Sequence, residues 1–388
     1  MKIISYGKQK IDQKDADAVC EVLRQDYLTQ GPQVEKFETD LSSYFGSKYC
    51  CAVSSGTAAL HLAGIALGWS RYDIIITTPI TFLATVNAIL YARAKPDFVD
   101  IDPFTYTIDP NKLEEKVKDY DKKGKRVKCV IGVDYAGLPC DWKALRFLAD
   151  KYEFKLINDN CHAMGASYFG DKNYSTKYAD IAVHSYHPVK PITTGEGGAI
   201  LTNNAQINSE VRELRTHGMT KNPSKLEKID GPWYYEMHQL GFNYRLTDFQ
   251  CALGISQLKK LDSFNKRRKH IARKYNEHLK NLKDVILPPS ISSSEHAFHL
   301  YPIKINFDKK IISKNNFFTK MKEDGILLQV HYIPVHLQPF YKKKFGFKSG
   351  DYPHSENFYS QEFSFPIFPS LKERDQEYVI DKIKIHLA

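Results

Sequence analysis

The sequence lacks any run approaching the ~18–20 consecutive apolar residues that a membrane-spanning helix needs. Its first fifteen residues also lack the long apolar stretch of a signal peptide. We therefore expect a cytoplasmic protein with no membrane as a partner. Internal repeats and low-complexity segments are missing as well, which excludes solenoid and fibrous architectures.

Cysteines are few and scattered. The chain has seven, an odd number, and no pair is spaced CxxC, so neither a disulfide framework nor a zinc ribbon is expected. His184 and His187 could belong to a metal site, but no third ligand lies near them in the sequence, and we expect no metal.

Zinc-finger spacing, an RNP-type aromatic strand motif and a long basic tail are also absent, although the net charge is +10. The Lys and Arg residues are spread along the chain apart from clusters such as 266–269 and 342–344. We therefore expect no nucleic-acid partner. A phosphorylated small molecule suits this charge better.

The length predicts two domains, because 388 residues exceed the ~250–300 at which a single core usually stops growing. Over the first 200 residues, short β-rich runs alternate with helix-like segments, which is typical of an α/β fold with a largely parallel sheet. The predicted strands are Tyr49–Val53, Ile74–Thr77, Phe98–Ile101, Val127–Val133, Phe154–Asn158, Ile181–Ser185 and Ala199–Thr202.

The pattern then turns continuously helical from Thr247 to about Leu282 and breaks at Pro288-Pro289. We predict a large domain over residues 1–250 and a small α+β domain over residues 251–388, entered through the long helical stretch. The elements predicted after the break are a strand at Leu300–Phe307, a helix around Phe317–Glu323, a strand near Ile326–Val330 and a final helix from about Glu373.

Small residues follow an apolar strand at Val53–Leu60, where a helix begins at once. Free amides at the helix N-terminus and the small side chains of Ser55, Gly56 and Thr57 would let a phosphate approach closely. The same residues could instead form an ordinary N-cap. This segment alone leaves both interpretations open.

Asp159 ends a second apolar strand, at the edge where open α/β sheets bind ligands. Such a carboxylate can cap the next helix, hold a metal or face a protonated ring nitrogen. His162, three residues on, could reach the same ligand or fill the first turn of the helix.

Lys190 lies between Pro188 and Pro191, in irregular backbone that connects two apolar strands. Glycines at 195, 197 and 198 permit close packing around it. A lysine amine can form a Schiff base with a carbonyl, which is how pyridoxal phosphate is held. A solvated loop lysine is the alternative for Lys190 alone.

These features occur in a fixed order: the phosphate turn, an aromatic segment at Pro79–Thr85, Asp159, then Ser185 five residues before Lys190. In this order they resemble the fold-type I pyridoxal-phosphate enzymes, specifically the DegT/DnrJ/EryC1/StrS nucleotide-sugar aminotransferases. The resemblance extends over nearly the whole chain. Later segments that join it are Leu240–Leu246 with Gln250 and Gly254, His299–Ile303, and Gly325 with Gln329–Pro334.

The resemblance implies an aspartate-aminotransferase-like fold, with a seven-stranded, mostly parallel sheet in the large domain and a small α+β C-terminal domain. It also implies a homodimer with shared active sites and pyridoxal 5'-phosphate as the cofactor. Lys190 would form the Schiff base and act as base and acid, and Asp159 would keep the pyridine nitrogen protonated. The remaining cofactor residues implied are Phe82 on the ring face, Gly56, Thr57 and Ser185 at the phosphate, His162 near the phenolic oxygen, and Asn243 or Arg245 from the neighbouring subunit.

One departure is visible, because relatives often carry Glu where this chain has Asn158. It leaves the hydrogen bonding beside Asp159 open. The family-like segments that have no cofactor role are expected to bind the substrates. The substrate residues implied in this way are Thr29, Gly31, Tyr301, His331 and Tyr332.

The family resemblance implies amino transfer from glutamate to C4 of a UDP-4-keto-6-deoxy-N-acetylhexosamine. Four segments favour the β-L-altrosamine product, a pseudaminic-acid precursor: Ile75–Ile80, Val133–Gly137, Lys190–Thr194 and Gln329–Tyr332. A sister enzyme of the bacillosamine type would share every cofactor residue. A non-catalytic regulator would need an attached DNA-binding module, and related dehydratases lack the lysine that this chain retains.

Overall fold

A seven-stranded sheet forms the centre of the computed structural model, which describes residues 3–387. The strand order is β2-β9-β8-β6-β5-β3-β4, and only β9 runs antiparallel to its neighbours. The predicted seven-stranded, mostly parallel sheet is confirmed. Its strands are β2 (Tyr49–Val53), β3 (Ile74–Thr77), β4 (Lys95–Phe98), β5 (Val127–Val133), β6 (Lys155–Asp159), β8 (Ile181–Ser185) and β9 (Gly198–Thr202).

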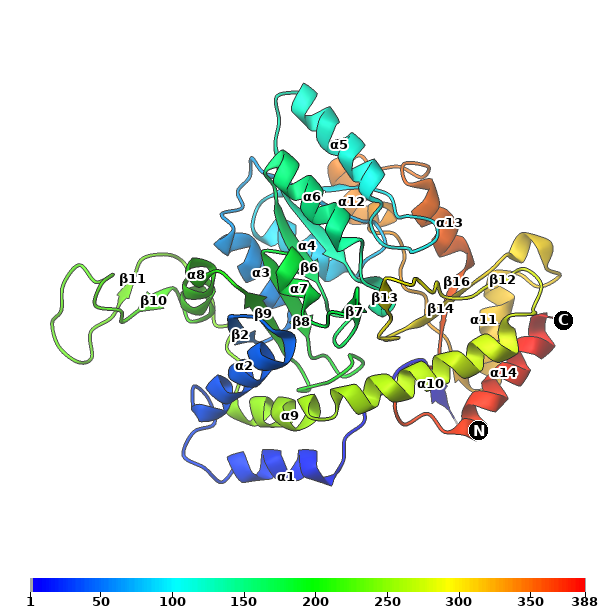
Figure 1. Cartoon of the computed structure of the whole chain (residues 1–388), viewed down its shortest axis with the longest axis horizontal. Coiled ribbons are helices and arrows are strands. Elements are labelled where there is room, and N and C mark those ends of the chain that lie inside the picture. The colour runs from blue at the N-terminus through cyan, green and yellow to red at the C-terminus, as the bar shows by residue number, and fades with distance from the viewer. Residues whose placement is uncertain (1–2, 388) are drawn as a thin grey trace.

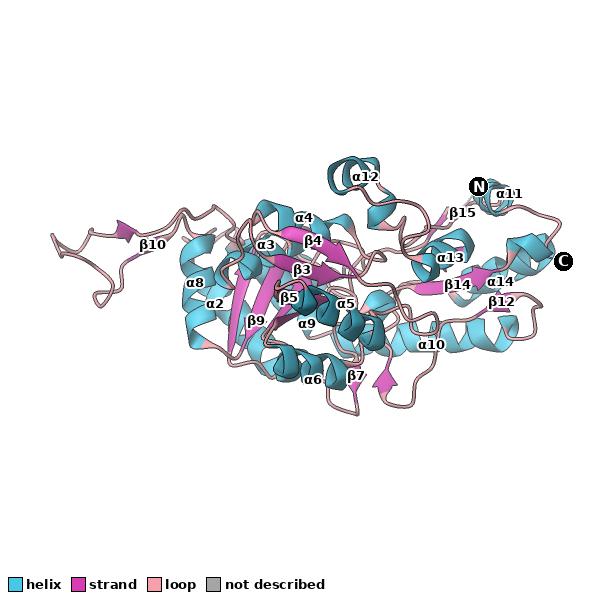
Figure 2. Cartoon of the chain, turned by 90° about the horizontal axis from the view of Figure 1, so that it is seen from above, coloured by secondary structure: helices cyan, strands magenta, loops and turns pink. Residues whose placement is uncertain are grey.

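Both faces of this sheet are buried, which explains why its strands are almost continuously apolar. On β6, Ile157 packs into the core on one face and Leu156 into the core on the other. Figures 1 and 2 show the helices on both sides. The helices that cover one face are α3 (Gly56–Ala66), α4 (Leu83–Tyr91) and α8 (Ala205–Arg215); those on the other are α2 (Pro32–Phe45), α5 (Pro110–Lys122), α6 (Trp142–Tyr152), α7 (Tyr174–Tyr178) and α9 (Asp248–Leu258).

A second core lies around the three-stranded sheet β12-β14-β16. Strand β1 (Ile4–Ser5) crosses from the N-terminal segment and pairs in parallel with β15 (Ile326–Leu327). The division at residue 250 stays a prediction. The elements of this part are α10 (Leu261–Leu279), α11 (Lys314–Glu323), α14 (Glu373–Leu387), β12 (Val285–Ile286), β14 (Tyr301–Ile305) and β16 (Glu362–Phe365). Helix α12 (Pro339–Phe345) packs against the core of the large sheet through Tyr341, and α13 (Pro353–Gln361) lies beside it in the chain.

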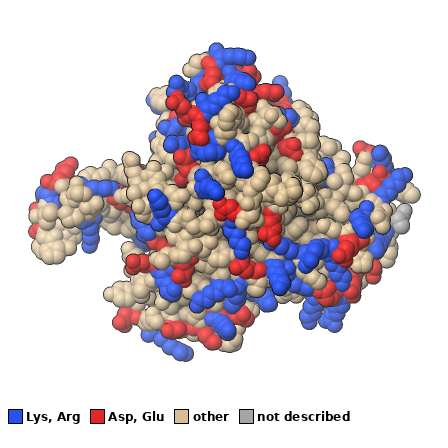
Figure 3. Space-filling model, viewed as in Figure 1, with Lys and Arg blue, Asp and Glu red and all other residues tan. Residues whose placement is uncertain are grey.

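The remaining elements are short or peripheral. Helix α1 precedes α2, β7 pairs with β13, and β10 pairs with β11 in an arm that projects from the body (Figure 2). No helix in residues 3–387 has the length and apolarity to cross a bilayer. Over the face seen in Figure 3, Lys and Arg lie among Asp and Glu. The bounds are α1 (Gln13–Val22), β7 (Ser167–Tyr168), β13 (Ser294–Glu295), β10 (Met219–Thr220) and β11 (Glu236–Met237).

Two predicted elements differ most from the structure, and the strand predicted near Ile326–Val330 is shortened to β15 (Ile326–Leu327). The strand predicted at Phe98–Ile101 begins earlier as β4, because its pairing with β3 starts at Lys95 opposite Ile74. The continuous helix predicted from Thr247 is two helices, α9 and α10, interrupted at 259–260. At this break the Lys260 ammonium pairs with carboxylates at 12 and 15, which ties the joint to α1.

Glu38 on α2 supports the strand that leads to the predicted phosphate turn. Its buried carboxylate accepts a hydrogen bond from the Ala52 amide on β2 at 2.9 Å. It also pairs with Arg212 at 2.7 Å and with Arg215 at 2.6 Å, both on α8. The network therefore joins α2, β2 and α8.

We predict that Glu38→Gln lowers the free energy of unfolding by about 2–3 kcal/mol, since two guanidinium groups then lose their buried counter-charge. The expected loss is below the ~3–5 kcal/mol typical of a broken buried ion pair, because Arg212 is partly exposed. Chemical denaturation measures the free energy of unfolding. The matched control is Glu373→Gln, which also removes a carboxylate shared by Arg267 and Lys274 but at an exposed position, and should cost at most about 1 kcal/mol. Equal losses for the two variants would contradict the prediction.

Candidate active site

A cavity of about 560 Å³ opens at the carboxyl ends of β6 and β8, where open α/β sheets place their ligands. Residues from the sheet, from the N-termini of α3 and α4 and from the segment after β15 line it. The cavity brings together ten of the residues named from the sequence for a cofactor or substrate: Ser55, Gly56, Thr57, Phe82, Asp159, His162, Ser185, Lys190, His331 and Tyr332.

The turn before α3 has the geometry of an anion site. Ser55 is the N-cap, and its side chain accepts a hydrogen bond from the Ala58 amide at 3.0 Å. Among the described residues, no hydrogen bond uses the Gly56 or Thr57 amide, so both N–H groups remain for a ligand. A Cβ at position 56 would lie 2.8 Å from that of Ser185. Glycine is therefore required for Ser185 to stand beside these amides.

Asp159 is buried at the end of β6, and both of its oxygens are held. The Thr85 hydroxyl on α4 donates to Oδ2 at 2.8 Å, and the Cys161 amide donates to Oδ1 at 3.3 Å. Thr85 is in turn hydrogen-bonded to Thr81 at 2.8 Å. The carboxylate is thus fixed in direction toward the cavity that it lines.

Lys190 follows β8 and is kept in place by its own backbone, since its amide donates to the His187 carbonyl at 2.9 Å. Burial lowers the pKa of the Lys190 amine, and the attraction of Asp159 opposes this shift. A lowered pKa increases the fraction of neutral amine, which is the nucleophilic form. Lys190 is therefore suited to attack a carbonyl.

Phe82 is the N-cap residue of α4 and is 57% exposed. Its ring centroid lies 6.0 Å from that of Tyr332, in a tilted arrangement. It is an apolar surface left open at the cavity, where a flat ring could pack.

His331 and Tyr332 enter the cavity from the segment after β15. The Tyr135 hydroxyl donates to the His331 carbonyl at 2.5 Å, and the His331 amide donates to the buried Glu362 at 2.9 Å. His331 Nδ1 is hydrogen-bonded to the Ser364 hydroxyl at 2.8 Å. Burial and the nearby Lys190 lower the pKa of His331 to about 3, so its imidazole is neutral.

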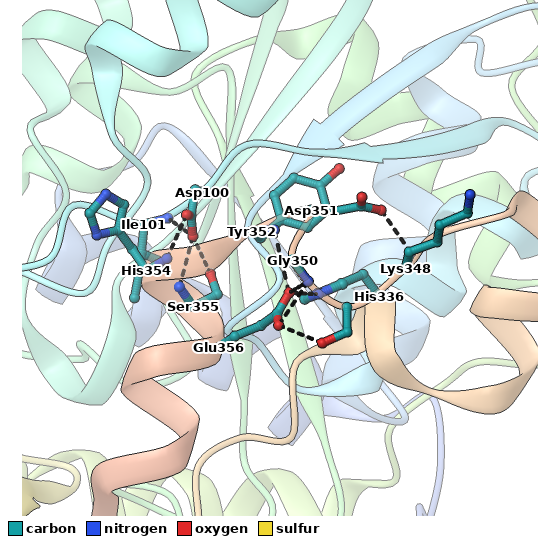
Figure 4. Close-up of polar contacts among 11 residues, drawn as sticks. Asp100, Ile101, His336, Lys348, Gly350, Asp351, Tyr352, His354, Ser355 and Glu356 are labelled. Atoms are coloured by element: carbon teal, nitrogen blue, oxygen red, sulfur yellow. Dashed lines mark hydrogen bonds and ion pairs between the residues drawn. The ribbon is translucent and has the colours of Figure 1, made fainter. Parts of the chain in front are cut away.

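Two carboxylates anchor the chain that follows this segment (Figure 4). Asp100, just after β4, accepts hydrogen bonds from the His354 amide and from the amide and hydroxyl of Ser355. Glu356 accepts from the His336 ring at 2.9 Å and from the Gly350 amide at 2.8 Å. The Asp100 contacts therefore hold the start of α13 beside the end of β4, and the Glu356 contacts join α13 to the segments at 336 and 350.

Four of the named residues lie outside this cavity, as does Arg245, the alternative to Asn243. Asn243 forms an isolated bridge with Thr216 at the base of the β10–β11 arm. Thr29 bridges to Thr247, and the Gly31 amide donates to Asp248 at 2.8 Å. Tyr301 is fully buried in the second core, where its hydroxyl donates to Asn276 at 2.5 Å.

Sequence reasoning missed Thr85 and Tyr6, which both line the cavity. Threonine in a helix carries no pattern that marks it as a carboxylate partner, and Tyr6 precedes every recognisable motif. Asn158, the departure from the family pattern, is buried, and neither polar atom of its side chain has a partner among the described residues.

Taken together, the cavity offers free amides and a hydroxyl for a phosphate, a lysine amine for a carbonyl, a fixed carboxylate for a ring nitrogen, and an apolar face. This set of groups fits pyridoxal 5'-phosphate.

The comparisons with known proteins agree with this chemistry. The model of the DegT/DnrJ/EryC1/StrS aminotransferase family matches residues 9–384. The UDP-4-amino-4,6-dideoxy-N-acetyl-beta-L-altrosamine transaminase of Campylobacter jejuni is 38% identical over 98% of this chain and 96% of its own. Helicobacter pylori PseC, described as an aminotransferase involved in the biosynthesis of pseudoaminic acid, has a TM-score of 0.89 and 30% identity over 100% and 99% of the two chains. The PLP form of Streptococcus pneumoniae Spr1654 has a TM-score of 0.88 and 26% identity over 99% and 98%.

Proposed function

Since this chain belongs to the DegT/DnrJ/EryC1/StrS aminotransferase family, we propose that it transfers an amino group from L-glutamate to C4 of UDP-2-acetamido-2,6-dideoxy-β-L-arabino-hex-4-ulose. The product would be UDP-4-amino-4,6-dideoxy-N-acetyl-β-L-altrosamine, the pseudaminic-acid precursor. The chain is a pyridoxal-phosphate-dependent sugar aminotransferase. The finer assignment is supported by the 38% identity, over 98% of this chain, to a transaminase that is named for this product.

The observation that carries the chemistry is the single cavity shared by Lys190, Asp159 and the free amides before α3. When bound, pyridoxal phosphate supplies an aldehyde that can take up the amino group and a ring that withdraws electrons. Lys190 would hold it and move the proton in each half-reaction. Asp159 would place a negative charge beside a protonated ring nitrogen, and Gly56, Thr57 and Ser185 would bind the phosphate.

The test is incubation of the purified protein with glutamate and each of two UDP-4-keto-6-deoxy sugars, the β-L-arabino compound and its bacillosamine-type epimer. NMR then gives the stereochemistry of the amine. Amination of the β-L-arabino compound at the higher kcat/KM supports the proposal. Preference for the other epimer assigns the sister activity, and amination of neither overturns both. We also propose a cytoplasmic site of action, as expected from the sequence.

We also propose that two copies of the chain complete each other's sites. The arm around β10 and β11 leaves the body (Figure 1) and exposes apolar side chains: Ile229 is 67%, Trp233 72% and Leu240 78% exposed. Exposed apolar surface of this kind is typical of an interface. Asn243 and Arg245 follow the arm and do not line the cavity of their own chain, so one of them would reach the phosphate of the partner.

Mixing Lys190→Ala and Asn243→Ala chains tests this arrangement. Lys190→Ala alone should be inactive, and so should Asn243→Ala where Asn243 is the residue that reaches the phosphate. The mixed dimer then has one site with both residues intact. At equal mixing we expect about a quarter of the wild-type activity, because half of the dimers are mixed and half of their sites are intact. Chromatography with two affinity tags verifies subunit exchange.

The control mixture is Lys190→Ala with Asp159→Asn, because these residues share one cavity and every site of the mixed dimer is then damaged. No activity should return. Recovery in the control, or none in the Asn243 mixture when Asn243→Ala alone is inactive, would contradict the shared site.

A further inference from the structure

A chain of hydrogen bonds with a fixed direction ends at Tyr332. It begins at the Ala136 amide, which donates to His162 Nδ1 at 3.2 Å. A backbone N–H can only donate, so this imidazole nitrogen carries no proton. Ala136 has a φ of 58°, a left-handed conformation that L side chains rarely adopt. The fold therefore holds this amide in an unusual orientation, against the ring of His162.

The second step is set by the charge of the imidazole. Burial and the nearby Lys190 and His331 lower the pKa of His162 well below its ordinary value, so the ring is neutral. Its single proton is then on Nε2, which lies 3.1 Å from the Tyr332 hydroxyl oxygen. His162 donates to this oxygen.

The third step concerns the proton of Tyr332 itself. Burial raises the pKa of this phenol well above its ordinary value, so the hydroxyl keeps its proton. Among residues 3–387, its oxygen has no hydrogen-bond partner besides His162. Because Tyr332 lines the cavity, the proton is available to a ligand there. The wall thus presents a hydrogen-bond donor of fixed direction.

We propose that Tyr332 donates this hydrogen bond to the C4 keto oxygen of the sugar substrate, with His162 as the positioning residue that sets the direction. The inference rests on the proposed function. A ketone oxygen only accepts, whereas the amine that replaces it is an ammonium group and only donates. Tyr332 therefore favours the keto sugar over the aminated product, which gives the site a means of releasing what it makes.

Tyr332→Phe removes the hydroxyl and keeps the ring. We expect kcat/KM for the keto sugar to fall about 10–100-fold, since a buried hydrogen-bond donor is lost. The Kd of the aminated product and kcat/KM for glutamate should change less than about threefold. The matched control is Tyr120→Phe on α5, whose hydroxyl donates to Asp97 at 2.6 Å, and all three constants should stay unchanged. Equal losses for the keto sugar and the product, or for glutamate, would overturn the proposal. So would a changed absorption maximum of the bound cofactor, because the hydroxyl would then contact the cofactor.

The positioning role of His162 is tested in two ways. In His162→Gln the amide oxygen can accept from Ala136 and the amide nitrogen can donate to Tyr332, so the loss in kcat/KM for the keto sugar should be at least about tenfold smaller than in His162→Leu. In His162→Leu, kcat/KM for the keto sugar should fall as far as in Tyr332→Phe. The double variant, which combines His162→Leu with Tyr332→Phe, should lose no more than either single variant. Additive losses would overturn the positioning role.

The tautomer of His162 can be read without any substrate. In ¹⁵N-histidine-labelled holoenzyme, the resonances missing from His162→Gln belong to His162, and they should show protonated Nε2 and unprotonated Nδ1. The opposite tautomer would overturn the hydrogen-bond chain. If the wild type aminates neither UDP-4-keto sugar, the proposed function fails and the keto-oxygen contact with it, whereas this measurement still decides the direction of the donor.

Discussion

Replacing Lys190 with alanine should abolish amino transfer, with any residual rate at least about 10²–10⁴-fold below wild type, the range for loss of a positioned proton-transfer group. The amine is the one lysine nitrogen among the residues that line the cavity, and its lowered pKa suits attack on a carbonyl. Turnover with glutamate and the UDP-4-keto sugar measures the loss. Borohydride reduction followed by peptide mapping should place the cofactor on Lys190 in the wild type and on no peptide of the variant.

The control is Lys155→Ala, which removes a half-exposed lysine paired with Asp180 at the start of β6. It should keep full activity and the covalent label. A Lys190→Ala protein that turns over normally would remove this residue from the mechanism.

The second large effect is expected for Asp159→Asn. The variant should retain the cofactor, because the phosphate amides and Lys190 are untouched, but the proton transfer should slow by about 10²–10⁴-fold. A neutral amide cannot favour protonation of the ring nitrogen as a carboxylate does.

Single-turnover kinetics in each half-reaction checks this prediction, with the cofactor content measured from the absorption of the same sample. The matched control is Asp150→Asn on α6, which pairs with Arg146 on the surface and should leave the rate unchanged. A normal single-turnover rate in Asp159→Asn would exclude a role for this carboxylate.

Strand ends are the part of the site that the sequence predicts well. Apolar runs mark β6 and β8 because both faces of the sheet are buried, and the residues that follow such runs meet at one edge. This is why Asp159 and Ser185 can be expected at one edge of the sheet, whereas the role of Lys190 came from the family resemblance. The small residues at 55–57 are equally informative, since a helix that begins directly after a strand leaves free amides at the same edge.

Long-range partners cannot be predicted in this way. The break at 259–260 coincides with ion pairs to α1, about 245 residues earlier in the chain. Tyr301 was predicted to bind substrate because it lies in a family-like segment. Side chains alternate between the two faces of β14, and Tyr301 lies on the face that packs into the second core. Thr85 and Ala136 matter through one hydrogen bond each, to Asp159 and His162. No periodicity in a single sequence reports such contacts.

The pairing of β1 with β15 has a consequence for how the chain matures during synthesis. Ile4 cannot form its strand pair until Ile326, its partner in the parallel pair, has been synthesised. At the usual ~5–20 residues per second, the two emerge from the ribosome roughly 15–60 s apart. Through that interval Ile4, which ends in the second core, has no partner. The second core can therefore close only after most of the polypeptide has been made.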